Sequence, residues 1–320
     1  MDHRPRLRTW FCVLATLFSL SSTLPAFAAE SLQRPSTASP LSSKTLLTDS
    51  TLAGQRIVAV GTRGHIVYSD DQGKSFSQAA VPTRMLLTAV DFVSDQEGWA
   101  VGHDAVILHT RDGGNSWELQ HEDAALEKPL LDVLFLDAQH GIAVGAYGLM
   151  LKTSDGGSSW EAAEVEEADW HFNALIKIKE GLLIVGEAGN LLRSDDMGET
   201  WTALESPYVG SLFGANSVGP DQQILIYGLR GHIYQSNDRG DSWEELKTDL
   251  TRNLFDSAEL PNGDVVVVGG GGTVLVKASA DQQFKKVPYP GYGNLVSVLP
   301  LSDTEVLLFG ARGAQPLKVR

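Results

Sequence analysis

The sequence predicts an all-β fold, a seven-bladed β-propeller with four-stranded blades. A dipeptide ending in glycine recurs seven times along the 320 residues, at steps of 41, 43, 41, 42, 41 and 41. An eight-residue motif with Asp at its third position and an aromatic residue at its end follows five of these copies. Glycine accounts for 32 of the 320 residues, which suits a chain with many tight turns. Four short strands repeated every 40–50 residues or so are typical of propeller blades.

The recurring dipeptides mark one strand in each unit. They are Val60-Gly61, Val101-Gly102, Val144-Gly145, Val185-Gly186, Tyr227-Gly228, Val268-Gly269 and Phe309-Gly310. Each is followed by a short turn and a strand in which apolar and polar residues alternate, the period-2 pattern of a half-buried β-strand. In the second unit the pattern predicts strands at 88–92, 98–101, 105–110 and 116–120.

A single propeller domain is predicted for residues 45–320. The seventh unit ends at Arg320, just after its third strand, and has no aromatic fourth strand. We expect the segment around 41–47 to supply the missing strand. The ring is then closed by an N-terminal strand, which removes an exposed sheet edge.

Residues 1–28 have the layout of a secretory signal peptide. Three arginines (Arg4, Arg6 and Arg8) precede an apolar run at 10–20, and Ala26-Phe27-Ala28 provides the small residues for cleavage before Ala29. An uncleaved anchor is the alternative, although the apolar run is short for a membrane span. The signal predicts an exported protein that is soluble after cleavage.

The next residues, 29–44, are rich in Ser and Pro and are predicted to form a flexible leader. The single cysteine, Cys12, lies before the predicted cleavage site, so we expect no disulfide in the mature chain. Cys12 is also too far from that site to receive a lipid. No direct membrane anchor is therefore expected after cleavage.

Charge and composition disfavour several classes of function. Acidic residues outnumber basic ones by 40 to 25, for a formal charge of −15, so sequence-independent binding to nucleic acid is not expected. No cofactor and no metal are predicted. The eight histidines show no metal-ligand spacing. The glycine run at 269–272 leads into a strand, whereas a phosphate-binding loop needs a following helix N-terminus.

The eight-residue motifs are Asp boxes, which resemble the bacterial neuraminidase (BNR) repeat. We predict a structural role at the turn between third and fourth strands: the Asp accepts backbone N–H groups, the Gly permits a positive φ, and the aromatic residue packs between blades. These structural residues are Asp71, Asp112, Asp155, Asp196 and Asp238, with Trp117, Trp160, Trp201 and Trp243. Calcium binding is the alternative, but a single Asp in each turn supplies few oxygens for that ion.

The repeat unit resembles those of the photosystem II stability/assembly factor propellers. The resemblance rests on Leu-Thr-Ala-Val-Asp-Phe at 87–92, Glu-Gly-Trp-Ala-Val-Gly at 97–102 and the Asp box that ends at Trp117. It covers about residues 45–320. For a photosynthetic organism it implies a lumenal or thylakoid-associated protein that helps to assemble the reaction centre and has an arginine-rich surface; otherwise the signal peptide predicts a periplasmic location. Relatives in non-photosynthetic bacteria look like exported proteins whose partners the family name does not reveal.

Strand connectivity separates two faces of the predicted propeller. The Asp boxes lie on one face. The other face carries the turns between second and third strands and the loops between blades, and propellers usually bind their partners there. The candidate residues for binding a partner or an anion on this face are Arg63, Arg84, Arg230, Arg252, Arg312, Tyr147 and Trp170, with His103, Asp104, His171 and Glu187 on the same rim. Arginine forks bind carboxylates in a bidentate manner. Pairing of these arginines with nearby acids, or capping of carbonyls, is the alternative.

These observations predict a non-enzymatic propeller that docks a protein partner, such as a membrane complex or transporter facing the same compartment. One alternative is a sialidase-like glycosidase with Arg63, Arg230 and Arg312 on the substrate carboxylate and Tyr147 and Glu187 beside them. The chain lacks an Arg-Ile-Pro segment in its first blade, has seven rather than six repeats, and places the three arginines at identical turn positions. A carbohydrate-binding propeller is a further alternative.

Overall fold

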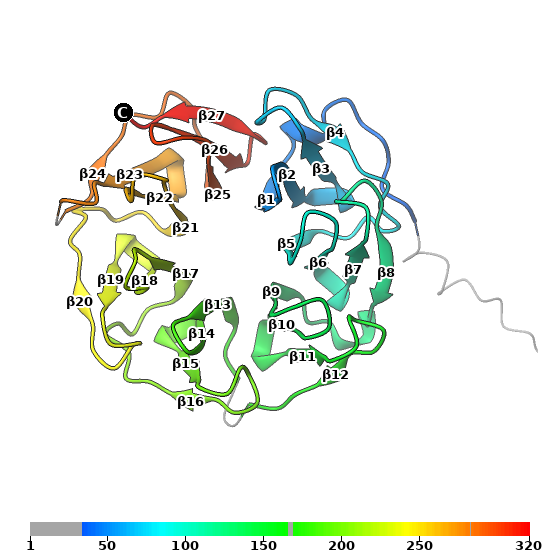
Figure 1. Cartoon of the computed structure of the whole chain (residues 1–320), viewed down its shortest axis with the longest axis horizontal. Coiled ribbons are helices and arrows are strands. Elements are labelled where there is room, and N and C mark those ends of the chain that lie inside the picture. The colour runs from blue at the N-terminus through cyan, green and yellow to red at the C-terminus, as the bar shows by residue number, and fades with distance from the viewer. Residues whose placement is uncertain (1–33, 166–168, 282) are drawn as a thin grey trace, which may run out of the picture.

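Seven antiparallel sheets stand in a ring, with the first strand of each sheet next to the central channel (Figure 1). The computed structural model describes residues 34–165, 169–281 and 283–320. Within them, six sheets have four strands and the last has three, and the strands of each sheet follow the order of the sequence. The prediction of an all-β, seven-bladed propeller is confirmed.

The strands are numbered along the chain. Blade 1 contains β1 (Leu47–Ala53), β2 (Arg56–Gly61), β3 (Ile66–Ser69) and β4 (Ser77–Gln78). Blade 2 contains β5 (Leu87–Phe92), β6 (Gly98–Gly102), β7 (Ile107–Thr110) and β8 (Glu118–His121). Blade 3 contains β9 (Leu130–Phe135), β10 (Gly141–Gly145), β11 (Met150–Thr153) and β12 (Glu161–Ala162). Blade 4 contains β13 (Phe172–Ile178), β14 (Gly181–Gly186), β15 (Leu191–Ser194) and β16 (Thr202–Ala203).

The remaining three blades repeat this plan. Blade 5 contains β17 (Leu212–Val218), β18 (Gln223–Gly228), β19 (Ile233–Ser236) and β20 (Glu244–Glu245). Blade 6 contains β21 (Leu254–Glu259), β22 (Val265–Gly269), β23 (Thr273–Lys277) and β24 (Lys285–Lys286). Blade 7 contains β25 (Leu295–Pro300), β26 (Glu305–Gly310) and β27 (Gln315–Lys318). The four strands predicted for the second unit match β5 to β8 within two residues at each end.

Short 3-10 turns are the helical elements of the described residues. Six join the second and third strands of blades 1 to 6: η2 (Thr62–Gly64), η3 (His103–Ala105), η5 (Ala146–Gly148), η6 (Glu187–Gly189), η7 (Leu229–Gly231) and η8 (Gly270–Gly272). The others are η1 (Ser42–Lys44) and η4 (Ala124–Leu126). In the described part of the chain, no helix is long and apolar enough to cross a membrane.

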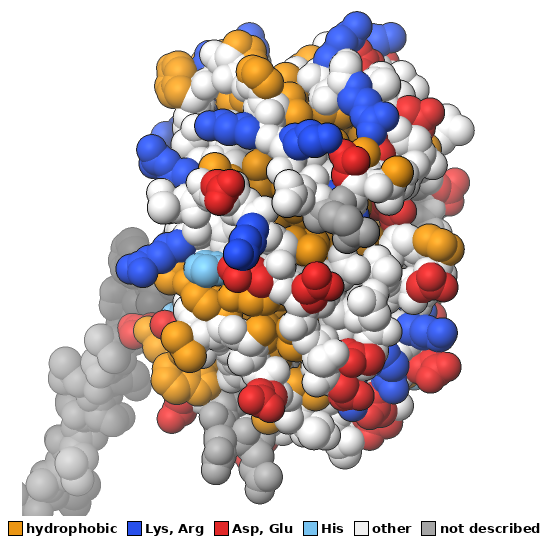
Figure 2. Space-filling model, turned by 90° about the vertical axis from the view of Figure 1, so that its left-hand side faces the viewer, with side chains coloured by type: hydrophobic (Ala, Val, Ile, Leu, Met, Phe, Trp, Pro, Cys, Tyr) orange, Lys and Arg blue, Asp and Glu red, His pale blue; other side chains and the backbone are white. Residues whose placement is uncertain are grey.

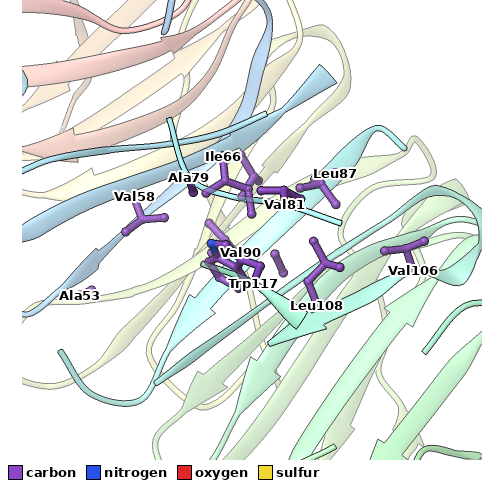
Figure 3. Packing of buried hydrophobic residues seen from close by; sticks show 12 residues of the cluster. Ala53, Val58, Ile66, Ala79, Val81, Leu87, Val90, Val106, Leu108 and Trp117 are labelled. Atoms are coloured by element: carbon purple, nitrogen blue, oxygen red, sulfur yellow. The ribbon is translucent and has the colours of Figure 1, made fainter. Parts of the chain in front are cut away.

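Hydrophobic clusters fill the interfaces between neighbouring blades. Figure 3 shows one of them, in which the indole of Trp117 from blade 2 lies among Val58 and Ile66 of blade 1 and Val90 and Leu108 of its own blade. The Asp-box aromatic residues Trp160, Trp201 and Trp243 join the corresponding clusters between the next pairs of blades. Each aromatic residue therefore ties its blade to the preceding one through apolar contacts.

The prediction that residues 41–47 supply a fourth strand to the last blade is wrong. Blade 7 has three strands, and the segment forms the turn η1 and then enters β1 of blade 1. Pro316 explains the difference. Pro316 in the third strand of blade 7 occupies the position that Tyr68 has in blade 1. Pro316 pairs with Leu307 and Tyr68 pairs with Val58, and each of these partners lies three residues before the glycine that ends its second strand. Tyr68 faces Ser77 of a fourth strand, whereas Pro316 has no N–H to donate to one.

Side chains, rather than a shared strand, close the ring between blades 7 and 1. Leu47 and Phe76 of blade 1 pack with Leu307 and Phe309 of blade 7. The hydroxyl groups of Ser50 and Ser297 lie 2.8 Å apart across the same interface. The predicted closing segment adds a backbone hydrogen bond across this interface, in which the carbonyl of Ser43 accepts the N–H of Ala314 at 3.1 Å.

The predicted signal peptide and the first residues of the predicted leader lie outside the described residues. The described part of the leader, residues 34–44, runs along blade 1. The N–H of Ser36 donates to the carbonyl of Val81 at 2.9 Å, and the side-chain oxygen of Gln78 accepts the N–H of Ser39 at 2.8 Å. The propeller boundary at residue 45 remains a prediction, because this segment is hydrogen-bonded to the first blade.

Candidate functional site

Two faces of the ring differ in their connections. We call the face that carries η2, η3 and η5 to η8, together with the loops between blades, the loop face. We call the opposite face, which carries the turns between third and fourth strands, the Asp-box face. Of the predicted binding residues, Arg63, Tyr147, Arg230 and Arg312 lie in second-to-third turns, and Arg84, Trp170 and Arg252 lie in loops between blades. All seven are exposed.

The turn geometry explains why these side chains point outward. Arg63, Tyr147 and Arg230 each occupy the left-handed region, with φ of 61°, 53° and 59°. The next residue in each turn is glycine. A Cβ at Gly64 would lie 2.0 Å from the carbonyl oxygen of Thr83, so the turn can rest directly on the loop between blades only if that residue is glycine.

None of the five loop-face arginines forms an ion pair with a described Asp or Glu. Arg84 donates to the carbonyl of Pro35 at 2.9 Å, and Arg312 lies 4.5 Å from the ring centroid of Tyr292. The pairing alternative therefore fails for these five side chains, while carbonyl capping applies to Arg84. Their forks are available to a ligand, apart from these contacts.

Arginines elsewhere on the ring behave differently. On the Asp-box face, Arg56 makes a bidentate contact with Asp70, at 2.7 and 2.9 Å, and Arg193 contacts Asp241 at 2.7 Å. Arg239 pairs with Asp195. Arg111 also has a carboxylate partner, Glu118 at 3.6 Å, and Arg320 pairs with Asp264. Unpaired arginine forks therefore gather on one face.

Tyr147 and Trp170 are brought together by the contact between blades 3 and 4. The carbonyl of Trp170 accepts the N–H of Gly148 at 2.9 Å. The ring of His171 meets that of Tyr147 edge-on, with centroids 4.6 Å apart. Tyr147 and Trp170 are 57% and 46% exposed, so both aromatic surfaces face solvent.

The catalytic arrangement of the glycosidase alternative is not assembled in this structure. Glu187 approaches His171, with 3.9 Å between Oε2 and Nδ1. Among the described residues no hydrogen bond joins Glu187 to the Tyr147 hydroxyl. The cavity in the central channel, of about 400 Å³, is lined by none of Arg63, Arg230 and Arg312.

The channel is instead lined by inner strands, among them carboxylates that the sequence reasoning missed. Asp49, Asp132 and Asp256 each accept the N–H of the next residue, and each also accepts an N–H from the inner strand of the following blade at 2.7–2.8 Å. Burial raises the pKa of these carboxyls to about 6, 8 and 7. Neighbouring carboxylates add to the effect.

Other polar side chains complete the ring of bridges between blades. Asp91 accepts the N–H of Phe135, linking blades 2 and 3. Asn173 donates to the carbonyl of Leu212, linking blades 4 and 5, and Asn216 donates to that of Ser257, linking blades 5 and 6. With the Ser50–Ser297 contact, all seven interfaces have a polar bridge. These bonds fix the positions of the inner strands, and through them the loops on the loop face.

The Asp boxes form hydrogen bonds within their own turns. In the second box the Thr110 hydroxyl donates to Asp112 at 2.8 Å and accepts the N–H of Gly114 at 3.0 Å, while Asp112 accepts the N–H and hydroxyl of Ser116. The other boxes repeat these bonds. They hold the pKa of Asp71 and Asp196 at about 2, chiefly through Ser75 and Thr200. No group of three potential metal ligands occurs among the described residues.

A second cavity, of about 650 Å³, lies on the Asp-box face between blades 3 and 4. Its lining includes Leu136, Lys152, Met197 and Glu199. Lys152 donates to Glu199 at 2.7 Å, so this charge is already satisfied within the protein. The cavity contains none of the predicted binding residues of the loop face.

Figure 2 shows the ring edge-on. Basic side chains lie mainly along its left-hand edge and upper part, whereas most acidic side chains lie to the right and below. The exposed arginines of the loop face that make no ion pair therefore give a strongly acidic chain a locally basic surface.

A family model described as "Photosynthesis system II assembly factor YCF48" matches residues 72–127 and 119–251, together more than half of the chain. A structure described as "YCF48 bound to D1 peptide" is 22% identical, with a TM-score of 0.70 over 87% of this chain and 94% of that one.

Two further structures show the same fold. "YCF48 from Cyanidioschyzon merolae" is 18% identical, with a TM-score of 0.69 over 87% of this chain and 96% of that one. The WD40 propeller domain of Doa1 is 13% identical, with a TM-score of 0.69 over 91% and 97%. No curated protein sequence matches significantly.

Proposed function

Because the chain belongs to the family of the photosystem II assembly factor YCF48, we propose that it is an exported, non-enzymatic docking factor whose loop face binds a protein partner in a membrane-associated complex. The observation that carries the proposal is the set of five arginines without carboxylate partners on one face. An arginine fork binds a carboxylate through two parallel hydrogen bonds. Acidic side chains or a C-terminal carboxylate of the partner fit this chemistry.

Exposed aromatic side chains strengthen the proposal. Tyr147 and Trp170 offer apolar area beside polar atoms, and such residues are enriched where protein interfaces gain most of their affinity. The structure titled "YCF48 bound to D1 peptide" concerns a protein of the same family with a peptide partner. It supports a protein segment, rather than a sugar, as the class of ligand for this chain.

Export is proposed from the signal-like pattern of residues 1–28. The compartment is the periplasm, or the thylakoid lumen if the source is photosynthetic. In either place the loop face would meet the soluble parts of membrane proteins. A membrane complex or a transporter is therefore the proposed class of partner.

The test is affinity recovery from a detergent-solubilised native envelope fraction, with mass spectrometry of the proteins that co-purify. The variant Arg63→Ala/Arg230→Ala removes two loop-face forks. We expect an unchanged thermal unfolding temperature and a loss of partner recovery of about tenfold or more, since hydrogen bonds to charged groups contribute about 1.5–3 kcal/mol each. Lys74→Ala/Arg111→Ala removes two exposed charges from the Asp-box face and should leave recovery intact.

Three outcomes would contradict the proposal. If the double arginine variant unfolds, the arginines are structural. If partner recovery is unchanged in it, they do not dock the partner. If the protein hydrolyses a fluorogenic sialoside, and Tyr147→Phe or Glu187→Gln abolishes that turnover, the chain is an enzyme and the glycosidase alternative holds.

A further inference from the structure

The loop face exposes most of the large hydrophobic side chains that protrude from the described residues. Six of eight lie in its turns and loops or in the segment beside them: Leu41, Leu126, Tyr147, Trp170, Val209 and Tyr292. The other two, Leu52 and Met197, lie on the Asp-box face. Docking of a carboxylate accounts for the arginines but not for these apolar side chains.

The two most exposed of them lie among the arginines. Val209, which is 90% exposed, is in the loop from blade 4 to blade 5, and Tyr292, which is 72% exposed, is in the loop from blade 6 to blade 7. Arg252 occupies the loop between these two, from blade 5 to blade 6. Arg312 packs on the ring of Tyr292 at 4.5 Å, so a cation and an aromatic surface are presented together.

Basic residues continue along this side of the ring. We call the part of the loop face from blade 5 through blade 7 to blade 1 the basic arc. It contains Arg230, Arg252, Arg312, Arg63 and Arg84, with Lys44 and Lys247 also exposed. Glu205, Glu245 and Asp249 are exposed acids of the same arc and are outnumbered. Leu41, 56% exposed, lies just before η1 at its blade 1 end.

We propose that the basic arc rests on an anionic lipid surface, with Val209, Tyr292 and Leu41 inserted at the level of the headgroups. This goes beyond the docking of a protein partner. Isolated apolar residues flanked by arginines suit the membrane interface, where aromatic rings sit at headgroup depth and basic residues meet anionic lipid.

The shape of the surface favours a bilayer over a peptide. The three apolar side chains stand on separate segments of the chain, and none lines the channel cavity or the cavities beside Arg230, beside Arg56 and between blades 3 and 4. A peptide needs a groove, whereas a flat lipid surface can meet several protruding residues at once. The acidic residues Asp104, Glu127 and Glu187 of blades 2 to 4 would then tilt away from the anionic lipid.

The test is co-sedimentation with vesicles of phosphatidylcholine, alone or mixed with anionic phosphatidylglycerol. The protein is purified in the form that remains after any cleavage in the cell, and every variant has the same N-terminal residues. Differences in vesicle binding between variants therefore come from the substituted residues of the loop face. We expect binding to the mixed vesicles that weakens with salt, as screening of exposed charges requires. Val209→Asp/Tyr292→Asp should reduce that binding about tenfold or more, because it removes both apolar contacts and adds two negative charges.

The matched control is Leu52→Asp/Met197→Asp, which makes the same change of charge at exposed apolar positions of the Asp-box face. It should bind vesicles like the wild type. Arg252→Ala should weaken binding to the mixed vesicles about fivefold, because one basic residue near such a surface contributes about 1 kcal/mol.

The result separates this proposal from the protein-docking one. Val209→Asp alone leaves the contact between Tyr292 and Arg312 in place, and it should still recover the protein partner from a detergent extract. The lipid proposal is overturned if the wild-type protein does not bind mixed vesicles, if the control loses as much binding, or if Val209→Asp loses partner recovery. The last result would assign Val209 to the protein-docking surface, whereas a failure of the arginine test alone would leave the vesicle result standing.

Discussion

Whether an arginine of this protein pairs with a carboxylate depends on the end of the strand at which it lies. At the Asp-box end the repeat itself supplies carboxylates: Asp70 is the second residue of the first box and pairs with Arg56, and Asp241 belongs to the fifth box and pairs with Arg193. The glycine turns around Arg63 and Arg230 contain no such residue. The repeat motif therefore neutralises arginines on one face and leaves them available on the other.

The hydroxyl at the first position of each Asp box should be essential to the turn. Thr110 is 2% exposed, and its hydroxyl serves both Asp112 and the N–H of Gly114. Thr110→Val keeps the shape of the side chain but leaves that N–H without a partner. We expect a loss of about 1–3 kcal/mol in the free energy of unfolding, measured by urea denaturation.

Thr110→Ser provides the control, because serine occupies the same position in the boxes that begin at Ser69, Ser194 and Ser236. It should restore most of the stability. Equal stability of Thr110→Val and the wild type would show that the hydroxyl is not needed to hold the turn.

At the scale of the element, the inner strand of every blade has a polar bridge to a neighbouring blade, but the residue that makes the bridge differs from blade to blade. Asp49, Asp132 and Asp256 occupy corresponding positions, two residues after the leucine that opens the strand, and bridge to the next blade. The corresponding residues elsewhere are Ala89, Ala174, Gly214 and Ser297, so neighbouring positions of the strand supply several of the other bridges. The interfaces are thus polar at the channel and apolar further out.

These carboxylates predict a stability that falls as the pH rises. Burial raises the folded-state pKa of Asp132 to about 8 from an ordinary 3.8, and that of Asp256 and Asp49 to about 7 and 6. Below pH 3.8 these carboxyls are protonated in both the folded and the unfolded chain, and their contribution to stability is fully present. Above pH 3.8 the unfolded chain releases its protons while the folded protein still holds them. The free energy of unfolding therefore falls until the folded-state carboxyls have also ionised, at about pH 8. Urea denaturation should give a lower free energy of unfolding at pH 8 than at pH 5.

Repulsion among the excess acidic residues would also lower the stability as the pH rises. The variant Asp132→Asn is therefore needed to isolate the effect of the Asp132 carboxyl. It cannot titrate, and it also loses one of the two N–H bonds that Asp132 accepts. We expect it to be less stable than the wild type at pH 5, with a difference that shrinks toward pH 8. A constant difference between pH 5 and pH 8 would contradict the raised pKa.

The strands and the faces could be predicted from the sequence because they depend on features that repeat. Seven glycine-ending dipeptides set the second strands, and strand connectivity then placed Arg63 and Arg230 on one face. The closing strand was mispredicted because Pro316 acts through a single missing N–H, which no periodic pattern reveals. The channel carboxylates were missed because only three of seven blades have Asp at that position. Whether an arginine is paired depends on distances between blades, which the sequence alone does not give.

For the whole molecule, the interface between blades 7 and 1 differs from the other six. The chain passes directly from blade to blade everywhere else, whereas here its two ends meet. Blade 7 lacks a fourth strand, and contacts such as that of Phe76 with Leu307 and Phe309 hold the ring closed. Local opening of a fold starts where the fewest cooperative contacts hold it. We therefore expect this interface to open first.

The variant Leu307→Ala tests this expectation. Leu307 is fully buried at the closing interface, and replacing a buried leucine by alanine costs about 2–5 kcal/mol. Leu183→Ala is the matched control, since Leu183 is equally buried between blades 4 and 5. Hydrogen exchange of Leu307→Ala should be faster in β1 and β26 while β13 and β14 stay protected, because the ring opens at its ends without unfolding the far blades. If both variants raise exchange equally in all seven blades, the ring unfolds as one unit and its closing interface is no weaker than the others.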